Sequence, residues 1–175
     1  MKYLVCSDIH GAIDSVDFLI DKFETLKCDK IILLGDVLYH GPRNDLPNFY
    51  EPKAVIKKLN LYKDKIICIK GNCEAEVDQM VLDFKILDSY YGTINDLDAH
   101  FEHGHHLDEY NGDAEVVFYG HIHIPVCEKK DNYLYINPGS ITLPKNNTKR
   151  SYIIWDEHEI ICYGMDDTIV FSYKY

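Results

Sequence analysis

The segment Tyr3-Leu4-Val5-Cys6-Ser7-Asp8-Ile9-His10 shows the pattern that decides the fold of this chain. Its first four residues form an apolar run typical of a buried strand, and the polar residues Asp8 and His10 follow at once. Residues 31–36 repeat the pattern and end in Gly-Asp, and residues 66–72 repeat it again and end in Lys-Gly-Asn. Each apolar run therefore delivers polar, ligand-binding side chains at its C-terminal end.

Helical patterns separate these three strands. Apolar residues from Val16 to Leu26 recur at helical spacing, with Asp14 or Ser15 as the N-cap. Pro52 can occupy the first turn of a second helix that runs to Leu59. This β-α-β-α-β order predicts parallel strands, whose carboxyl ends meet at one edge of a sheet.

The second half of the chain is rich in short strand patterns, with short turns between them and little room for helices. We predict a second, largely antiparallel sheet packed on the first, with helices outside. The expected fold class is α/β, a four-layer α/β/β/α sandwich of two mixed sheets, and residues 1–175 form a single domain. The strands expected in this half are residues 99–102, 116–119, 133–136, 151–155, 159–163 and 168–173.

The overall composition is that of a soluble globular protein, with 46% hydrophobic and 27% charged residues. No apolar run approaches the roughly 20 residues that span a bilayer, and the N-terminus lacks the features of a signal peptide, so we expect no membrane partner. A formal charge of −11 without a basic stripe argues against polymeric nucleic acid as a partner. Six scattered cysteines without a C-x-x-C pair favour reduced thiols and a cytoplasmic location.

Five short motifs lie at or just past the predicted strand ends. Asp, His and Asn side chains suit Mn, Fe, Zn or Ni better than the all-oxygen shell that calcium prefers. Each motif alone is a common turn, so the prediction of one binuclear metal site rests on their order and spacing together. The motifs are Asp8-Ile9-His10, Gly35-Asp36, Gly71-Asn72-Cys73-Glu74, His103-Gly104-His105 and Gly120-His121-Ile122-His123.

This series resembles the calcineurin-like metallophosphoesterase superfamily, whose pattern runs D-x-H, G-D, G-N-[HC]-[DE], H, G-H-x-H. It looks closest to the YfcE-like phosphodiesterases, with which residues 35–44, 76–80 and 137–140 are shared in kind and place. The resemblance implies two divalent transition-metal ions, Mn first, with Ni, Zn or Fe also suited. It further implies that a hydroxide bridging the ions attacks the phosphorus of a small phosphodiester. The implied ligands are Asp8, His10, Asp36 and His123 for one ion and Asp36, Asn72, His103 and His121 for the other, with the Asp36 carboxylate bridging.

Cys73 is the main departure from the commoner pattern of the superfamily. Many members carry His there, which can bind the phosphate and protonate the leaving alkoxide, whereas a thiol is a weak donor. Loss of this acid matters most for monoesters, so Cys73 favours phosphodiesters; the alternative is that Cys73 merely packs. Glu74 stands where Asp is commoner and would hydrogen-bond a ligating His.

The loop of residues 39–52 is long enough to suspect a function. It carries Arg43, which would clamp the phosphate or form a surface ion pair, and His40, which would contact substrate or cap the turn. His105 is a candidate for binding the phosphoryl group or donating a proton. We therefore expect Asp36, Asn72 and His105 as catalytic residues, and Arg43, Cys73 and His40 as substrate contacts.

Two other functions in the same superfamily compete with a metal-dependent phosphodiesterase. A phosphomonoesterase would use the same metals, and a non-catalytic protein-interaction scaffold, like the retromer subunit, would keep the fold but lose or alter ligands. The complete ligand set favours catalysis. A nuclease is disfavoured by the charge of −11 and by the absence of His at position 73. The apolar C-terminus and fourteen tyrosines favour a homo-oligomer, a dimer or a tetramer.

Overall fold

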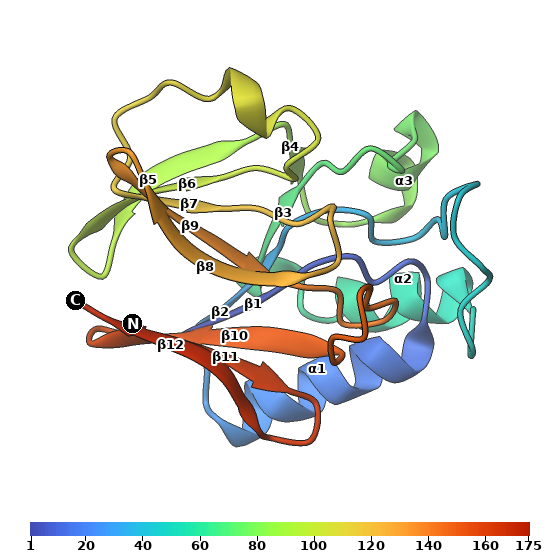
Figure 1. Ribbon diagram of the computed structural model, residues 1–175. Helices are drawn as coiled ribbons and strands as arrows, with labels where there is room; N and C mark the ends of the chain where they lie inside the picture. Colours follow the sequence, from blue (N-terminus) through green and yellow to red (C-terminus); the bar gives the residue numbers. More distant parts are fainter.

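Two β-sheets lie face to face in the computed structural model, which describes residues 1–175 (Figure 1). The first sheet has seven strands in the order β12-β11-β10-β1-β2-β3-β4, in which β1 to β4 run parallel and β10 to β12 are antiparallel to their neighbours. The bounds are β1 Tyr3–Cys6, β2 Lys30–Leu33, β3 Ile66–Ile69, β4 Ile86–Leu87, β10 Ser151–Trp155, β11 Glu159–Gly164 and β12 Ile169–Lys174.

The second sheet has five strands in the order β5-β6-β7-β9-β8. Its three central strands β6, β7 and β9 are parallel, and the edge strands β5 and β8 pair antiparallel. Both sheets are therefore mixed, as predicted, but the expectation of a largely antiparallel second sheet was wrong, because its three central strands are parallel. The bounds are β5 Tyr90–Ile94, β6 Leu97–Phe101, β7 Val116–Phe118, β8 Pro125–Lys130 and β9 Tyr133–Pro138.

Helices α1 (Ile13–Thr25) and α2 (Pro52–Asn60) lie together on the outer face of the first sheet, as Figure 1 shows. The short helix α3 (Glu76–Val81) follows β3, and one-turn 3₁₀ helices occupy Lys63–Lys65 and Leu107–Glu109. The sandwich of two mixed sheets is confirmed, but its layer over the second sheet is thin, since that face carries the 3₁₀ turn Leu107–Glu109.

Two other details of the sequence prediction were wrong. The strands β10, β11 and β12 do not join the second sheet; they extend the first one, because β10 pairs antiparallel with β1. The N-cap of α1 is Ala12, without a side-chain cap. Asp14 and Ser15 are instead occupied by tertiary partners, since Arg150 donates Nη1 to Asp14 at 2.9 Å and Nη2 to the Ser15 hydroxyl at 2.7 Å.

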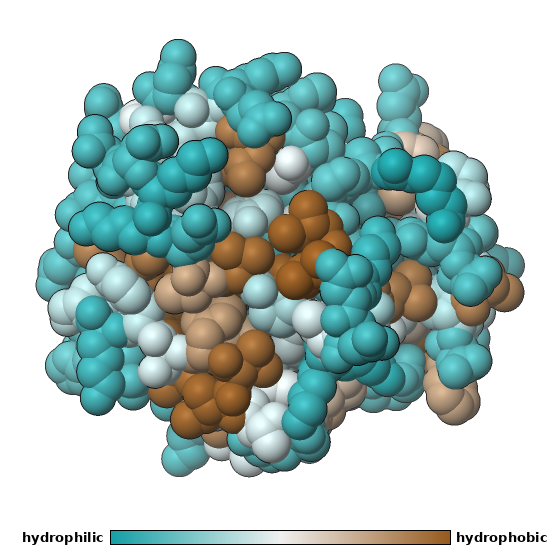
Figure 2. All heavy atoms as spheres, viewed as in Figure 1, coloured by the Kyte–Doolittle hydropathy of each residue, from teal (hydrophilic) through white to brown (hydrophobic).

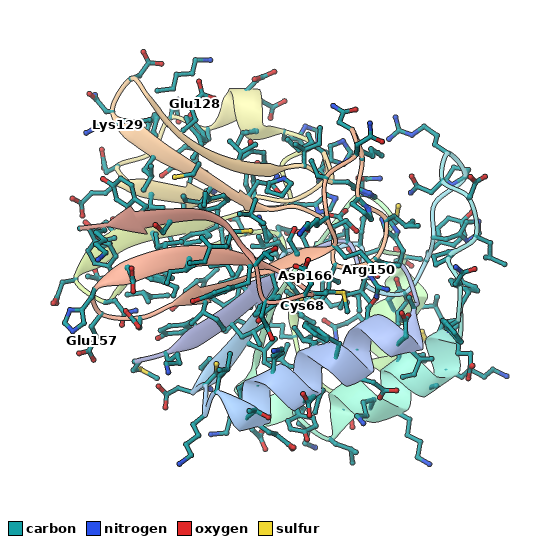
Figure 3. The ribbon with its side chains drawn as sticks, turned by 60° about the horizontal axis from the view of Figure 1, so that its bottom comes forward. Cys68, Glu128, Lys129, Arg150, Glu157 and Asp166 are labelled. Carbon is teal, nitrogen blue, oxygen red and sulfur yellow. The ribbon has the colours of Figure 1, made fainter.

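Arg150 also donates its Nε to the carbonyl oxygen of Ile141 at 2.7 Å. Figure 3 shows Arg150 beside the N-terminal end of α1. One guanidinium thus ties the segment between β9 and β10 to the first helix, and this segment contributes to the site described below.

The two faces of the first sheet bury separate hydrophobic clusters. One cluster packs α1 and α2 against the sheet, and the other fills the space between the sheets around the fully buried Trp155. The ring of Trp155 lies 5.0 Å from that of Phe118, which stacks on Phe101 at 5.1 Å. Burying each such side chain stabilises the fold by roughly 1.5–3 kcal/mol, so this aromatic group holds the second sheet on the first.

Strand β12 is an exposed edge of the first sheet. Ile169 is 63% exposed and Val170 41% exposed, and Figure 2 shows hydrophobic side chains gathered over β11 and β12 at the lower edge of this face. Such an edge is available for pairing with another chain. The expected homo-oligomer stays a prediction, and β12 is the surface through which it would form. None of the helices is long and apolar enough to cross a membrane.

Candidate metal centre

All seven predicted ligands lie in loops just past strand ends, at one edge of the sandwich. The loops after β1, β2 and β3 come from the first sheet, and those after β6 and β7 come from the second. Five of the seven predicted ligands have left-handed backbone, with φ between 50° and 68°. A left-handed residue with a side chain costs roughly 1–2 kcal/mol, and such strain is typical of functional sites. The five are Asp8, His10, Asp36, His121 and His123.

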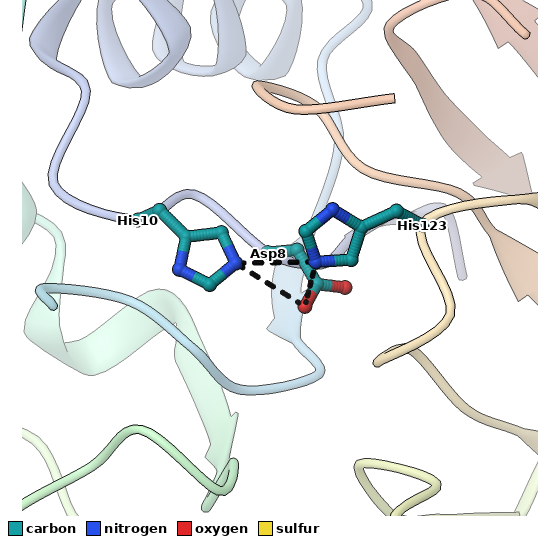
Figure 4. Close-up of side chains that lie close together, drawn as sticks. All are labelled: Asp8, His10 and His123. Atoms are coloured by element: carbon teal, nitrogen blue, oxygen red, sulfur yellow. Dashed lines mark hydrogen bonds and ion pairs between the residues drawn. The ribbon is translucent and has the colours of Figure 1, made fainter. Parts of the chain in front are cut away.

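Asp8, His10 and His123 form the first group of ligand atoms (Figure 4). Nε2 of His123 lies 3.2 Å from Oδ1 of Asp8 and 3.2 Å from Nε2 of His10. Nε2 of His10 lies 3.7 Å from the same Asp8 oxygen. Three donor atoms from two loops, one on each sheet, thus surround one point.

Asp36 lies between this group and a second one. Its Oδ2 is 3.8 Å from Nε2 of His10 and 3.4 Å from Nε2 of His103. Nε2 of His103 in turn lies 3.1 Å from Oδ1 of Asn72, and the ring of His121 lies 5.2 Å from the ring of His103. The carboxylate of Asp36 therefore faces both groups, as a bridging ligand would.

Three of the histidines are oriented by backbone carbonyl groups. Nδ1 of His10 donates to the carbonyl oxygen of Tyr39 at 2.7 Å, and Nδ1 of His103 donates to that of Leu34 at 2.6 Å. His123 makes the same contact with the carbonyl oxygen of Leu143 at 2.6 Å. Because a carbonyl can only accept, Nδ1 carries a proton in each ring, and Nε2 is the nitrogen left to bind a metal ion, which would displace any proton on it.

The electrostatics of this cluster suit cations. Oδ1 of Asp8 is buried without a hydrogen-bond partner, although a buried carboxylate oxygen normally has one. Burial acts to raise the pKa of Asp8, but hydrogen bonds and charges from His10, His103 and His123 lower it below its ordinary value. Burial acts to lower the pKa of His103, yet contacts with Asp36 and Asp8 raise it to about 9. The residues present therefore fit divalent ions held by nitrogen and oxygen donors.

Glu74 does not contact a ligating histidine, contrary to the sequence-based expectation. Its carboxylate accepts the backbone N–H groups of Asp36 at 3.0 Å, Val37 at 2.6 Å and Gly71. It thereby joins the loop after β3 to the loop after β2. The longer Glu side chain reaches this neighbouring backbone, so Glu74 positions Asp36 through its peptide groups.

Gly35 and Gly71 let these two loops approach closely. Gly35 has a φ of +94°, and a Cβ placed on it would lie 2.6 Å from the backbone nitrogen of Gly71 and 2.8 Å from Nδ1 of His103. A Cβ on Gly71 would overlap the side chain of Asp36. Glycine is thus required at both positions for the ligands to meet.

Cys73 is half-buried at the side of the cluster. Its backbone N–H donates to Oδ1 of Asp36 at 2.8 Å, and its Sγ accepts from Nδ2 of Asn72 at 3.4 Å. Burial, followed by the charge of Asp36 and a hydrogen bond to it, raises the pKa of the thiol to about 12. The side chain is therefore a neutral thiol at neutral pH, and its Sγ lies within 4.8 Å of ligand atoms of His10 and Asp36.

A pocket of about 370 Å³ opens over the ligands Asp36, Asn72, His121 and His123. Arg43 lines it. Ligand pockets of small molecules begin at about 300 Å³, so this space suits a small substrate. The remaining lining residues are Gly41, Pro42, Asn44, Cys73, Ile122 and Lys145.

The other two predicted site residues lie outside this pocket. The ring of His40 packs between the rings of Tyr39, 4.7 Å away, and Tyr50, 5.4 Å away. His105 lines a neighbouring pocket that it shares with His103, and its ring lies 5.6 Å from the ring of His103. His105 is exposed, and its ring lies 6.2 Å from the ring of His121.

Ser140 and Lys145 also contribute to the site, although no role for either was predicted from the sequence. Ser140 is fully buried, and its hydroxyl donates to the carbonyl oxygen of Asp8 at 2.8 Å while accepting from the N–H of Leu143 at 2.7 Å. It therefore fixes the turn that carries one predicted ligand. The motif Asn-Pro-Gly-Ser at residues 137–140 was the available signal for Ser140, whereas no pattern pointed to Lys145.

Comparison with known proteins assigns the chain to one family. The calcineurin-like phosphoesterase superfamily domain, as a family model, matches residues 1–159. Phosphodiesterase YfcE of Escherichia coli (strain K12) is 35% identical over 177 residues, which cover 98% of this chain and 96% of that protein. The solved structure of YfcE, a phosphoesterase from E. coli, has a TM-score of 0.94 at 34% identity and covers 99% of each chain.

More distant structures share the fold alone. Vps29 of Entamoeba histolytica, solved with Zn²⁺, has a TM-score of 0.66 at 17% identity and covers 99% of each chain. An archaeal phosphodiesterase has a TM-score of 0.69 at 24% identity.

Proposed function

The chain belongs to the calcineurin-like phosphoesterase superfamily, and we propose that it hydrolyses small phosphodiesters at a centre of two divalent metal ions. The observation that carries the proposal is the position of Asp36, whose carboxylate lies within 4 Å of His10 in one group and of His103 in the other. Ions held by these residues would supply a hydroxide at neutral pH and would neutralise charge on the phosphoryl oxygens.

The residues would divide the two ions between them. Asp8, His10 and His123 would hold one, and Asn72, His103 and His121 the other, with Asp36 shared. Nitrogen and oxygen donors of this kind suit Mn²⁺, which we propose first, and accept Ni²⁺, Zn²⁺ or Fe²⁺.

The pocket residues would act on the phosphate itself. Arg43 is exposed in the pocket and has no carboxylate partner, so its guanidinium is free to clamp a phosphoryl oxygen. His105 would bind the phosphoryl group or donate a proton to the leaving oxygen. Cys73, as a neutral thiol, would protonate a leaving alkoxide poorly, which favours diesters with good leaving groups over monoesters.

A cytoplasmic location was inferred from the sequence and stays a prediction. All six cysteines are free, which suits a reducing compartment. A non-catalytic scaffold would not need donor atoms that converge on two points, so catalysis is the better explanation of the cluster.

Hydrolysis of bis(p-nitrophenyl) phosphate, measured with Mn²⁺ and with a chelator, tests the proposal. We expect Mn²⁺-dependent release of p-nitrophenol, at least 10²-fold reduced by Asp36→Asn, since removing one group that stabilises transition-state charge costs this much. Asp21→Asn, an exposed substitution on α1, is the matched control. Hydrolysis that survives the chelator, or that Asp36→Asn leaves intact, would contradict the proposal.

A further inference from the structure

Two cationic side chains stand in the pocket over the metal-ligand cluster. Arg43 comes from the loop before α2, and Lys145 comes from the segment between β9 and β10. The chain as a whole carries a formal charge of −11. On the same segment as Lys145, Lys149 pairs with Asp166 and Arg150 with Asp14, whereas Lys145 and Arg43 have no carboxylate partner. Their charges are available to a ligand.

The backbone of Lys145 is fixed beside a predicted metal ligand. Its N–H donates to the carbonyl oxygen of His123 at 3.2 Å, and its carbonyl oxygen accepts from the N–H of Thr148 at 3.0 Å and from the Thr148 hydroxyl at 2.7 Å. Between them, Asn146 and Asn147 have φ values of 53° and 58°, the tight-turn conformation that asparagine tolerates. The exposed side chain of Lys145 thus begins from a fixed point and reaches into the pocket.

The scissile phosphate alone does not explain why the pocket carries the positive charge of Lys145. A phosphodiester carries one negative charge, and the proposed ions together with the guanidinium of Arg43 already match it. A further cation at the pocket wall is of use when the substrate brings a second anionic group.

We propose that Lys145 forms an anion subsite for a carboxylate or phosphate on the alcohol portion of the diester, separate from the scissile phosphate. This inference rests on the proposed function and names its substrate class: small phosphodiesters that are themselves acidic. The subsite selects them because an ammonium binds an anionic oxygen more strongly than the carbonyl oxygen of a neutral amide in its place.

The test uses two p-nitrophenyl diesters that differ at one group, a terminal carboxylate in one and the corresponding carboxamide in the other, with a terminal phosphate as a third arm. Wild type should prefer the anionic diesters, and Lys145→Met should lower kcat/KM for them by roughly tenfold, mainly through KM, with less than about a twofold change for the carboxamide. Lys145→Arg should retain the preference. Of the carboxylate and phosphate diesters, the one whose kcat/KM falls further in Lys145→Met carries the anionic group that Lys145 binds.

Lys129→Met is the matched control. Lys129 is exposed on β8 and does not line this pocket, and Figure 3 shows it far from Arg150, which lies on the same segment as Lys145. It should leave both substrates unaffected. Equal losses for the anionic and neutral diesters in Lys145→Met would overturn the inference, because Lys145 would then serve the scissile phosphate. No loss for either would overturn it as well.

Calorimetric binding of non-hydrolysable phosphonate analogues of the same diesters gives a second measurement that needs no turnover. The carboxylate analogue should bind wild type more tightly than the carboxamide analogue, and Lys145→Met should remove the difference. If wild type hydrolyses no diester, the proposed function fails while this difference still decides the subsite. If hydrolysis occurs without any difference in binding, the subsite fails and the proposed function stands.

Discussion

Oε1 of Glu74 accepts the backbone N–H of Val37 at 2.6 Å, so a residue of the third ligand-bearing loop holds the second one in place. The other carboxylate oxygen accepts the N–H groups of Asp36 and Gly71. The position of the Asp36 carboxylate is thus set through its own peptide group and from a neighbouring strand end.

Glu74→Ala should weaken both metal binding and stability. The backbone N–H groups left without an acceptor cost about 1–3 kcal/mol each when buried, and loss of an outer contact typically lowers metal affinity by about 10–100-fold. Mn²⁺ titration calorimetry and urea denaturation measure the two effects. Glu76→Ala, exposed on α3, is the control, and an unchanged Mn²⁺ affinity in Glu74→Ala would contradict the role.

Mn²⁺ should bind with a stoichiometry of two and raise the melting temperature. A ligand at a hundredfold excess over its Kd stabilises the folded state by about 2.7 kcal/mol. For a domain of this size, 1 kcal/mol corresponds to about 2–4 °C, so a rise of roughly 5–10 °C is expected, reversed by a chelator. Asp8→Asn should lose one ion and much of the shift; binding of a single ion to wild type would argue against two sites.

Cys73→His should raise phosphomonoesterase activity relative to phosphodiesterase activity. An imidazole can protonate the alkoxide that leaves a monoester, which the neutral thiol of Cys73 does poorly. The ratio of kcat/KM for p-nitrophenyl phosphate and bis(p-nitrophenyl) phosphate measures the change. Cys73→Ser, similar in size but without an imidazole, should leave the ratio near that of wild type. An unchanged ratio in Cys73→His would mean that Cys73 only packs.

Arg150→Met should destabilise the fold by about 1–3 kcal/mol. The hydrogen bond from its guanidinium to the carbonyl oxygen of Ile141 accounts for most of this, since the half-exposed ion pair with Asp14 contributes about 0–1 kcal/mol. Urea denaturation measures the change in the free energy of unfolding. Lys149→Met, which removes an exposed ion pair with Asp166, should lower the free energy of unfolding by less. Equal decreases in the two variants would contradict the role of Arg150 as a tether.

The parallel part of the fold could be predicted because its strands are continuous apolar runs bounded by polar turns. β1 and β3 begin and end at the predicted residues, and Pro52 opens α2. The partners of the later strands could not be predicted. A strand such as β10 is buried along its whole length, so alternation does not show which sheet it joins. β8 was missed because its second half is charged and exposed, as an edge strand allows.

Some residues of the candidate site could likewise be predicted from the sequence, and others could not. Ligand types and spacing predicted which side chains meet, because strand ends of one sheet share an edge. Lys145 could not be found, since a lone lysine in a polar loop carries no pattern, and only the turn at residues 145–148 brings it to the pocket. The substrate contact of His40 stays a prediction: its ring packs between two tyrosine rings and does not line the pocket over the ligands, a packing that only the folded loop sets.

Five predicted ligands have left-handed backbone, and a substitution that relieves this strain would raise thermal stability but lower activity. The five are Asp8, His10, Asp36, His121 and His123. Glycine adopts this conformation without the steric cost, and asparagine with less of it, so either residue would relax the chain there; glycine would remove the ligand, and asparagine would replace it with a neutral amide. A library selected for survival at high temperature alone would therefore accumulate inactive proteins through these positions. The strained loops thus distinguish a sequence selected for activity from one selected only for stability.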